Sequence, residues 1–85
     1  MKNVEIYTGP LCAFCDWTKA LLKKKGVTFK EINIGDDPNI MSEMLKKSNG
    51  MKTVPQIFID GKHIGGNQEL QALEKEGKLN SLLGI

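Results

Sequence analysis

The sequence predicts an α/β domain in which helices cover both faces of a mixed four-stranded sheet. Segments with strand and helix patterns alternate along the first half of the chain, and Asp60-Gly61 is a two-residue hairpin signal in the second half. A strand, a helix and a strand in succession require parallel pairing through a right-handed crossover. The hairpin then adds antiparallel strands, so the sheet is mixed.

Length and composition predict one folded domain over residues 1–85. Domains rarely have fewer than about 50 residues, so 85 residues leave no room for a second one. Apolar residues make up 40% of the chain, and adding the 9 Gly brings this share close to that of globular proteins. We therefore expect the chain to fold on its own apolar core.

The first half contains two predicted strands and two predicted helices. Val4 and Ile6 alternate with polar residues in a first strand that ends at Thr8-Gly9-Pro10, and a helix follows from about Cys12 to Gly26. The second strand is predicted over residues 27–34, with apolar contacts on both faces. The apolar residues of this first helix have helical spacing: Trp17, Ala20, Leu21 and Leu22. A second helix is predicted between Asp37-Pro38 and Asn49-Gly50, and its apolar residues are Ile40, Met41, Met44 and Leu45.

The second half predicts a hairpin followed by helices. Residues 56–59 form an almost continuous apolar strand, and residues 62–64 return as the fourth strand. Gly65-Gly66-Asn67 ends that strand. A third helix then extends to Gly77, and a last helical segment contains Leu79, Leu82 and Leu83.

Charge and hydropathy exclude several classes of function. The net charge is +2, and all twelve cationic residues are Lys. Arg is the residue that reads guanine edges and clamps phosphate, so its absence argues against a nucleic-acid partner. No apolar run approaches the roughly 18 residues of a membrane span, and residues 1–7 lack the apolar segment of a signal peptide. We expect a cytoplasmic protein without a membrane partner.

Cys12-Ala13-Phe14-Cys15 is the motif that carries chemistry. It follows the first strand and opens a helix, whose free N–H groups and partial positive charge favour a thiolate at the first sulfur and so lower the pKa of Cys12. Cys15 lies one helical turn away, where it can attack a mixed disulfide formed by Cys12. The alternatives are half of a zinc site or two unreactive thiols. Zinc needs three or four ligands, and the rest of the chain offers one His and no further Cys.

Two other motifs lie further along the chain. Pro55 stands at the entrance of an apolar strand, which is compatible with a cis Val54-Pro55 bond or with a trans Pro as the first strand residue. Gly65 to Glu69 opens the third helix, where N–H groups can hold a carboxylate and the Glu69 side chain can accept from an amine, although such sequences are also ordinary turns and caps. His63 is expected to be a surface residue of the hairpin.

Taken together, these motifs resemble the glutaredoxin family, specifically the small bacterial dithiol members of the glutaredoxin 3 type. The resemblance covers essentially the whole chain, and the order and spacing of the motifs are more specific than any one of them. The matching segments are Val4-Glu5-Ile6-Tyr7-Thr8, Cys12-Ala13-Phe14-Cys15, Lys19-Ala20-Leu21-Leu22, Gly26-Val27, Thr53-Val54-Pro55-Gln56-Ile57-Phe58-Ile59 and His63-Ile64-Gly65-Gly66.

The resemblance implies a thioredoxin-like fold, a cis peptide before Pro55, and reduction of protein disulfides and glutathione mixed disulfides. Glutathione is the implied electron donor, no cofactor is tightly bound, no metal is held, and the protein is a monomer whose partners are glutathione and disulfide-containing proteins. Cys12 and Cys15 are the catalytic pair. The implied glutathione-binding residues are Phe14, Thr53, Val54, Pro55, Gly66, Gln68 and Glu69.

The chain departs from the family pattern at three places. Ala13 and Phe14 replace the usual Pro-Tyr, which keeps an aromatic ring but loses a hydroxyl. Gly9-Pro10 stands where a basic residue is common. Gln68-Glu69 replaces an acidic pair, which leaves Glu69 as the partner for the glutathione amine.

Two other functions use the same thiols. Two chains can bridge an iron–sulfur cluster through Cys12 and glutathione, as a carrier or sensor does, and Ala13 in place of Pro is compatible with this. Alternatively, thioredoxin reductase rather than glutathione supplies the electrons.

Overall fold

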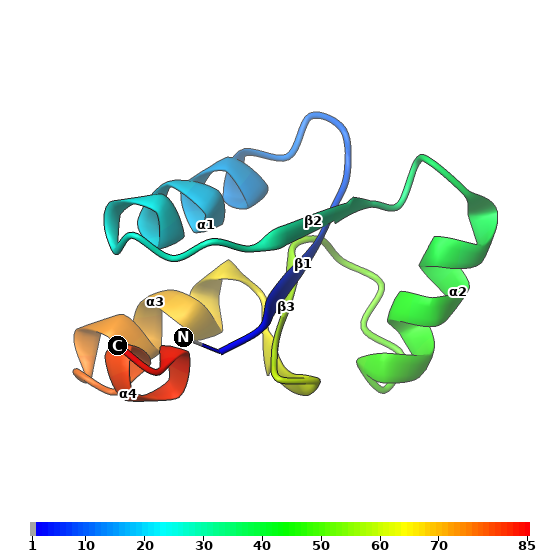
Figure 1. The fold of residues 1–85 in the computed structure, drawn as a ribbon. Helices are drawn as coiled ribbons and strands as arrows, with labels where there is room; N and C mark the ends of the chain where they lie inside the picture. Colours follow the sequence, from blue (N-terminus) through cyan, green and yellow to red (C-terminus); the bar gives the residue numbers. More distant parts are fainter. Residues whose placement is uncertain (1) are drawn as a thin grey trace.

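The computed structural model describes residues 2–85 and confirms the mixed four-stranded sheet with helices on both faces (Figure 1). Strand β1 pairs in parallel with β2 and antiparallel with β3, and β3 pairs antiparallel with β4, which gives the order β2-β1-β3-β4. The elements are β1 (Val4–Thr8), α1 (Ala13–Lys24), β2 (Lys30–Asn33), α2 (Pro38–Lys47), β3 (Gln56–Ile59), β4 (Lys62–Gly65), α3 (Asn67–Lys75) and α4 (Leu79–Leu83).

The two faces of the sheet carry two separate apolar clusters. Ile6 and Ile57 are fully buried in the cluster formed with α1, α3 and α4. Tyr7 and Phe58, their chain neighbours, point to the opposite face and pack with Met44 of α2, because successive side chains of a strand alternate between faces. Figure 1 shows α2 (green) on one side of the sheet and the other helices on the other side.

The second strand is shorter than predicted. It spans Lys30–Asn33 rather than residues 27–34, because Val27 donates its N–H to Leu22 O and so belongs to the turn that ends α1. The prediction of apolar contacts on both faces is confirmed. Phe29 packs against the α1 side of the sheet, whereas Ile32 and Ile34 pack against the α2 side.

Helix α1 begins directly after Cys12, as its sequence predicts, but its buried face differs from the apolar spacing. The buried residues are Cys15, Thr18 and Leu22. Trp17 is 57% exposed and forms an edge-to-face pair with Phe14, at 5.3 Å between ring centroids. The periodicity therefore identifies the helix but places one of its largest side chains wrongly.

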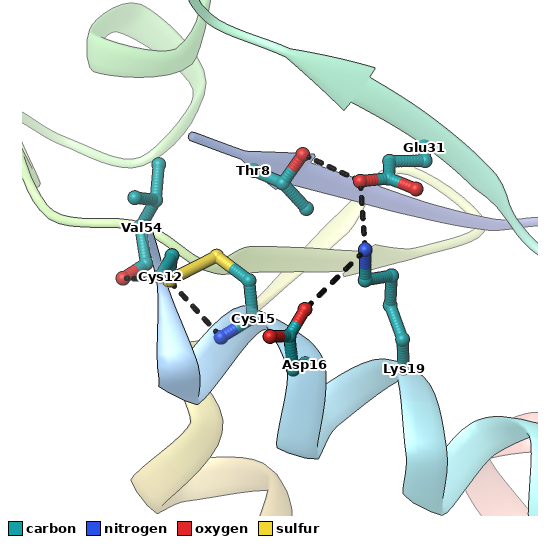
Figure 2. A network of polar contacts seen from close by, with 7 residues as sticks. All are labelled: Thr8, Cys12, Cys15, Asp16, Lys19, Glu31 and Val54. Atoms are coloured by element: carbon teal, nitrogen blue, oxygen red, sulfur yellow. Dashed lines mark hydrogen bonds and ion pairs between the residues drawn. A yellow bond between two sulfur atoms is a disulfide. The ribbon is translucent and has the colours of Figure 1, made fainter. Parts of the chain in front are cut away.

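A chain of polar contacts joins β1, β2 and α1 beside the two cysteines (Figure 2). Thr8 Oγ1 donates to Glu31 Oε2 at 2.9 Å, and Lys19 Nζ donates to the same oxygen at 3.1 Å. Lys19 also lies 3.8 Å from Asp16 Oδ1 in the first turn of α1. The bonds from Lys19 and Thr8 hold the pKa of the Glu31 carboxyl below its ordinary value of 4.5.

Glu31→Gln tests the contribution of this network to stability. The Glu31 side chain is 40% exposed, so we expect the variant to lose at most about 1 kcal/mol of unfolding free energy at about pH 7. Because the pKa is lower in the folded state, the contribution is complete above the unfolded pKa and is lost as pH falls through the folded pKa. Urea unfolding should show that the difference in unfolding free energy between wild type and Glu31→Gln is smaller at about pH 3 than at about pH 7. A difference independent of pH would contradict the assigned pairing.

Candidate active site

Cys12 and Cys15 form a disulfide at the start of α1 (Figure 2). Cys12 is the N-cap residue, and its Sγ accepts a hydrogen bond from the backbone N–H of Cys15 at 3.0 Å. Cys12 is partly exposed, whereas Cys15 is only 2% exposed. Of the two residues, Cys12 is therefore the one that a molecule in solution can approach.

The helix start supplies the electrostatics of this pair. The first N–H groups of a helix have no carbonyl partner within the helix and carry a partial positive charge. The Cys15 N–H already points at Cys12 Sγ, so it can stabilise negative charge there without rearrangement. Asp16 follows in the same turn, and Lys19 offsets part of its charge.

The segment that precedes β3 borders the cysteine pair. The Val54-Pro55 peptide bond is cis, as the resemblance implies. Val54 O lies 3.6 Å from Cys12 Sγ, so backbone that is distant in sequence borders the reactive sulfur. Figure 2 shows Val54 beside the disulfide, on the side away from Lys19.

A groove of about 630 Å³ extends from this segment to α3. The groove is lined by all seven residues that the resemblance implies for glutathione binding: Phe14, Thr53, Val54, Pro55, Gly66, Gln68 and Glu69. Sequence reasoning missed four other lining residues: Met51, Gln56, Asn67 and Gln71. Gln71 was accessible to such reasoning, because it lies three residues after Gln68 and so on the same helix face. Asn67 lies within the Gly65 to Glu69 motif, but the partner of its side chain, Thr18, is defined only by the fold. Nothing local marks Met51 or Gln56.

The start of α3 reaches the groove because two glycines precede it. A Cβ on Gly66 would lie 3.2 Å from Pro55 O, so a larger residue would crowd the cis-proline segment. Gly65 has a φ of +122°, and a Cβ there would meet the Glu69 side chain at 2.7 Å. Glu69 Oε1 accepts from the Gly66 N–H at 3.2 Å, so its carboxylate is held at the helix start.

Helix α3 is also joined to α1. Thr18 Oγ1 donates to Asn67 Oδ1 at 3.0 Å, and Gln71 Nε2 lies 3.3 Å from the same oxygen. Thr18 belongs to the buried face of α1, one turn after the cysteines. The two helix starts that border the groove are therefore fixed relative to each other.

Within residues 2–85, no group of three or more His, Cys, Asp or Glu side chains has the arrangement of a metal site. Nor does any helix in this part of the chain have the length and apolar character to cross a membrane.

Comparison with known proteins identifies relatives over nearly the whole chain. Residues 4–64 match the family model described as Glutaredoxin. Glutaredoxin 3 of Escherichia coli strain K12 is 52% identical over 83 residues, which is 98% of this chain and 99% of that protein. Glutaredoxin of Pseudomonas aeruginosa is 46% identical over 83 residues and 98% of each chain.

Solved structures agree with the sequence matches. Glutaredoxin from Brucella melitensis has a TM-score of 0.84 and 49% identity, covering 98% of this chain and 89% of that one. The buckwheat glutaredoxin–glutathione complex has a TM-score of 0.88 and 27% identity, covering 98% and 77%. The likeness confirms the thioredoxin-like fold implied by the sequence. With its disulfide-forming pair at the start of α1, the chain belongs to the glutaredoxin family of thiol–disulfide oxidoreductases.

Proposed function

We propose that the protein uses glutathione to reduce protein disulfides and glutathione mixed disulfides. The observation that carries the proposal is the Cys12–Cys15 disulfide beside a groove that ends at the first turn of α3. The disulfide is the oxidised state of the proposed cycle, and the groove is the proposed glutathione site. The buckwheat relative, whose structure is a complex with glutathione, supports this choice of donor.

The first step is attack by the Cys12 thiolate on a sulfur of the substrate disulfide. A bond forms between Cys12 Sγ and that sulfur, the substrate S–S bond breaks, and the departing thiolate takes a proton from water. The exposure of Cys12 and the burial of Cys15 support Cys12 as the attacking residue. The Cys15 N–H stabilises the attacking sulfur before the step.

The mixed disulfide is then resolved in one of two ways. When Cys12 carries glutathione, a second glutathione thiolate attacks the glutathione sulfur, which releases oxidised glutathione and restores the Cys12 thiolate. When Cys12 carries a protein, the Cys15 thiolate attacks Cys12 Sγ, which releases the reduced protein and leaves the intramolecular disulfide. Two glutathione molecules then reduce this disulfide in sequence and leave as oxidised glutathione.

The ends of the groove match the chemistry of glutathione. Its γ-glutamyl end carries a carboxylate and an ammonium group. The N–H groups at the start of α3 suit the carboxylate, and the Glu69 carboxylate suits the ammonium. The Val54 backbone, beside Cys12, is available for strand-like pairing with the cysteinyl residue.

In this proposal glutathione is a co-substrate rather than a bound cofactor, and the protein acts as a monomer. Its partners are glutathione and disulfide-containing proteins, with neither nucleic acid nor membrane involved. The reaction consumes reduced glutathione and contributes to redox homeostasis, so the reducing cytoplasm is the proposed location.

A second candidate function, carriage of an iron–sulfur cluster, is favoured by Ala13. This residue is the first of α1, where Pro would fix φ and remove an N–H beside the sulfur. Cys12 is accessible for a cluster shared between two chains and two glutathione thiols, whereas the buried Cys15 is not needed. Brown colour after anaerobic purification would favour this function, and a colourless, active protein would eliminate it.

Substitution of each cysteine separates the two thiols. Cys12→Ser should reduce turnover of the mixed disulfide between glutathione and 2-hydroxyethanethiol at least about a thousandfold, because the hydroxyl is a far weaker nucleophile. Cys15→Ser should retain this turnover, since glutathione replaces the resolving thiol. The assay couples glutathione oxidation to glutathione reductase. Equal losses in both variants would contradict the roles, and turnover with thioredoxin reductase but not with glutathione would change the donor.

Glu69→Gln tests the proposed ammonium site. The amide retains an acceptor for the Gly66 N–H but removes the charge, so α3 should remain capped. We expect the KM for glutathione to rise about twofold to fivefold, the upper part of the range for an exposed ion pair, with a smaller change in kcat. Glu76→Gln removes the same charge at the other end of α3 and should leave KM unchanged. A fall in kcat alone would place Glu69 outside the binding site.

A further inference from the structure

Gln56 is a fully buried polar residue that lines the groove and has no role in the reaction proposed above. It is the first residue of β3 and directly follows the cis proline. A buried amide is costly unless its donors and acceptor are paired. Its Nε2 lies 3.0 Å from Thr53 O and 3.3 Å from Thr53 Oγ1, and its Oε1 lies 2.6 Å from His63 Nε2.

Chemistry fixes the direction of these hydrogen bonds. If the amide were reversed, its oxygen would face Thr53 O, and two acceptors would meet without a hydrogen between them. The Gln56 nitrogen must therefore face Thr53. Its oxygen can only accept, so His63 Nε2 carries a hydrogen and donates it. The order of donation is His63 to Gln56 to Thr53.

His63 is itself held by packing. It lies opposite Phe58 in the β3–β4 ladder, and the two rings lie 5.0 Å apart between centroids at an angle of 34°. Phe58 is 1% exposed and belongs to the apolar cluster that contains Tyr7 and Met44 of α2. The imidazole therefore has a fixed position from which to orient the Gln56 amide. His63 is half-buried, not the surface residue that the sequence predicts.

The hydrogen bonds have a consequence at Thr53. Its hydroxyl oxygen accepts from Gln56, so its own hydrogen is not used in that bond and remains available to an acceptor in the groove. Thr53 is exposed and precedes Val54, whose carbonyl borders Cys12. Glutathione offers such acceptors in its carboxylates and peptide carbonyls.

We propose that His63 is a positioning residue for substrate binding: through Gln56 it holds Thr53 with the hydroxyl poised to donate to a carboxylate or peptide carbonyl of glutathione. The inference rests on the proposed function, because it takes glutathione as the occupant of the groove. It assigns roles to Gln56 and His63, neither of which takes part in the exchange of thiols and disulfides.

Two substitutions of His63 separate positioning from packing. His63→Phe keeps a ring against Phe58 but cannot donate to Gln56, whereas His63→Gln can donate through its amide nitrogen. With the glutathione mixed disulfide of 2-hydroxyethanethiol, His63→Phe should raise KM about threefold to tenfold, the range for one lost hydrogen bond, and leave kcat within about twofold. His63→Gln should restore the wild-type KM. An unchanged KM in His63→Phe, or equal changes in both variants, overturns the proposal.

A double-mutant cycle tests whether His63 acts through Thr53. Thr53→Val removes the hydroxyl, so adding His63→Phe should raise KM no further than the larger single effect. If the two substitutions raise KM independently, so that their fold-changes multiply, His63 does not act through Thr53 and the proposal is overturned.

A measurement without glutathione keeps this proposal distinct from the proposed function. In the nuclear magnetic resonance spectrum, exchange of the Gln56 side-chain amide hydrogens with solvent should be faster in His63→Phe than in wild type and unchanged in His63→Gln. If wild type fails to turn over the mixed disulfide, the proposed function fails. If exchange is the same in all three proteins, the relay fails.

Discussion

The site depends on one constraint: the sulfur of Cys12 lies at the start of α1, where a backbone N–H donates to it. This requires the chain to leave β1 at Thr8, turn within the four residues 9–12 and enter α1 at Ala13. Burial of Cys15 and Thr18 on one face then fixes the rotation of the helix, so that Cys12 remains accessible. The reactivity of the pair follows from backbone geometry rather than from a neighbouring acid or base.

The sheet supplies the second half of the site. Antiparallel pairing of β1 with β3 brings the start of β3 next to the end of β1, at Tyr7 opposite Gln56. The cis-proline segment consequently lies beside Cys12, and the two glycines after β4 let α3 begin close to Pro55. The groove is therefore built from segments that are far apart in sequence and that only the complete sheet brings together.

Local chemistry made most of the fold predictable. Strand alternation and the Asp60-Gly61 turn each act over a few residues, as does the Asp37 side chain, which caps α2 by accepting from the Asn39 N–H. A cysteine pair with this spacing indicates thiol chemistry at the start of any helix. The boundary of β2 and the exposure of Trp17 were mispredicted, because both depend on what packs nearby. Gln56 and Asn67 were missed for the same reason. Their partners, His63 and Thr18, are defined only by the folded sheet and helices.

Titration of Cys12 shows whether the start of α1 stabilises its thiolate. In reduced Cys15→Ser, thiolate absorbance as a function of pH reports Cys12 alone, and the same protein unfolded in urea is the reference. We expect the folded protein to titrate at a pH well below about 8.5, the ordinary pKa of a thiol, and unfolding to remove the shift. If the folded protein titrates at or above the pH of the unfolded reference, the start of α1 does not stabilise the thiolate.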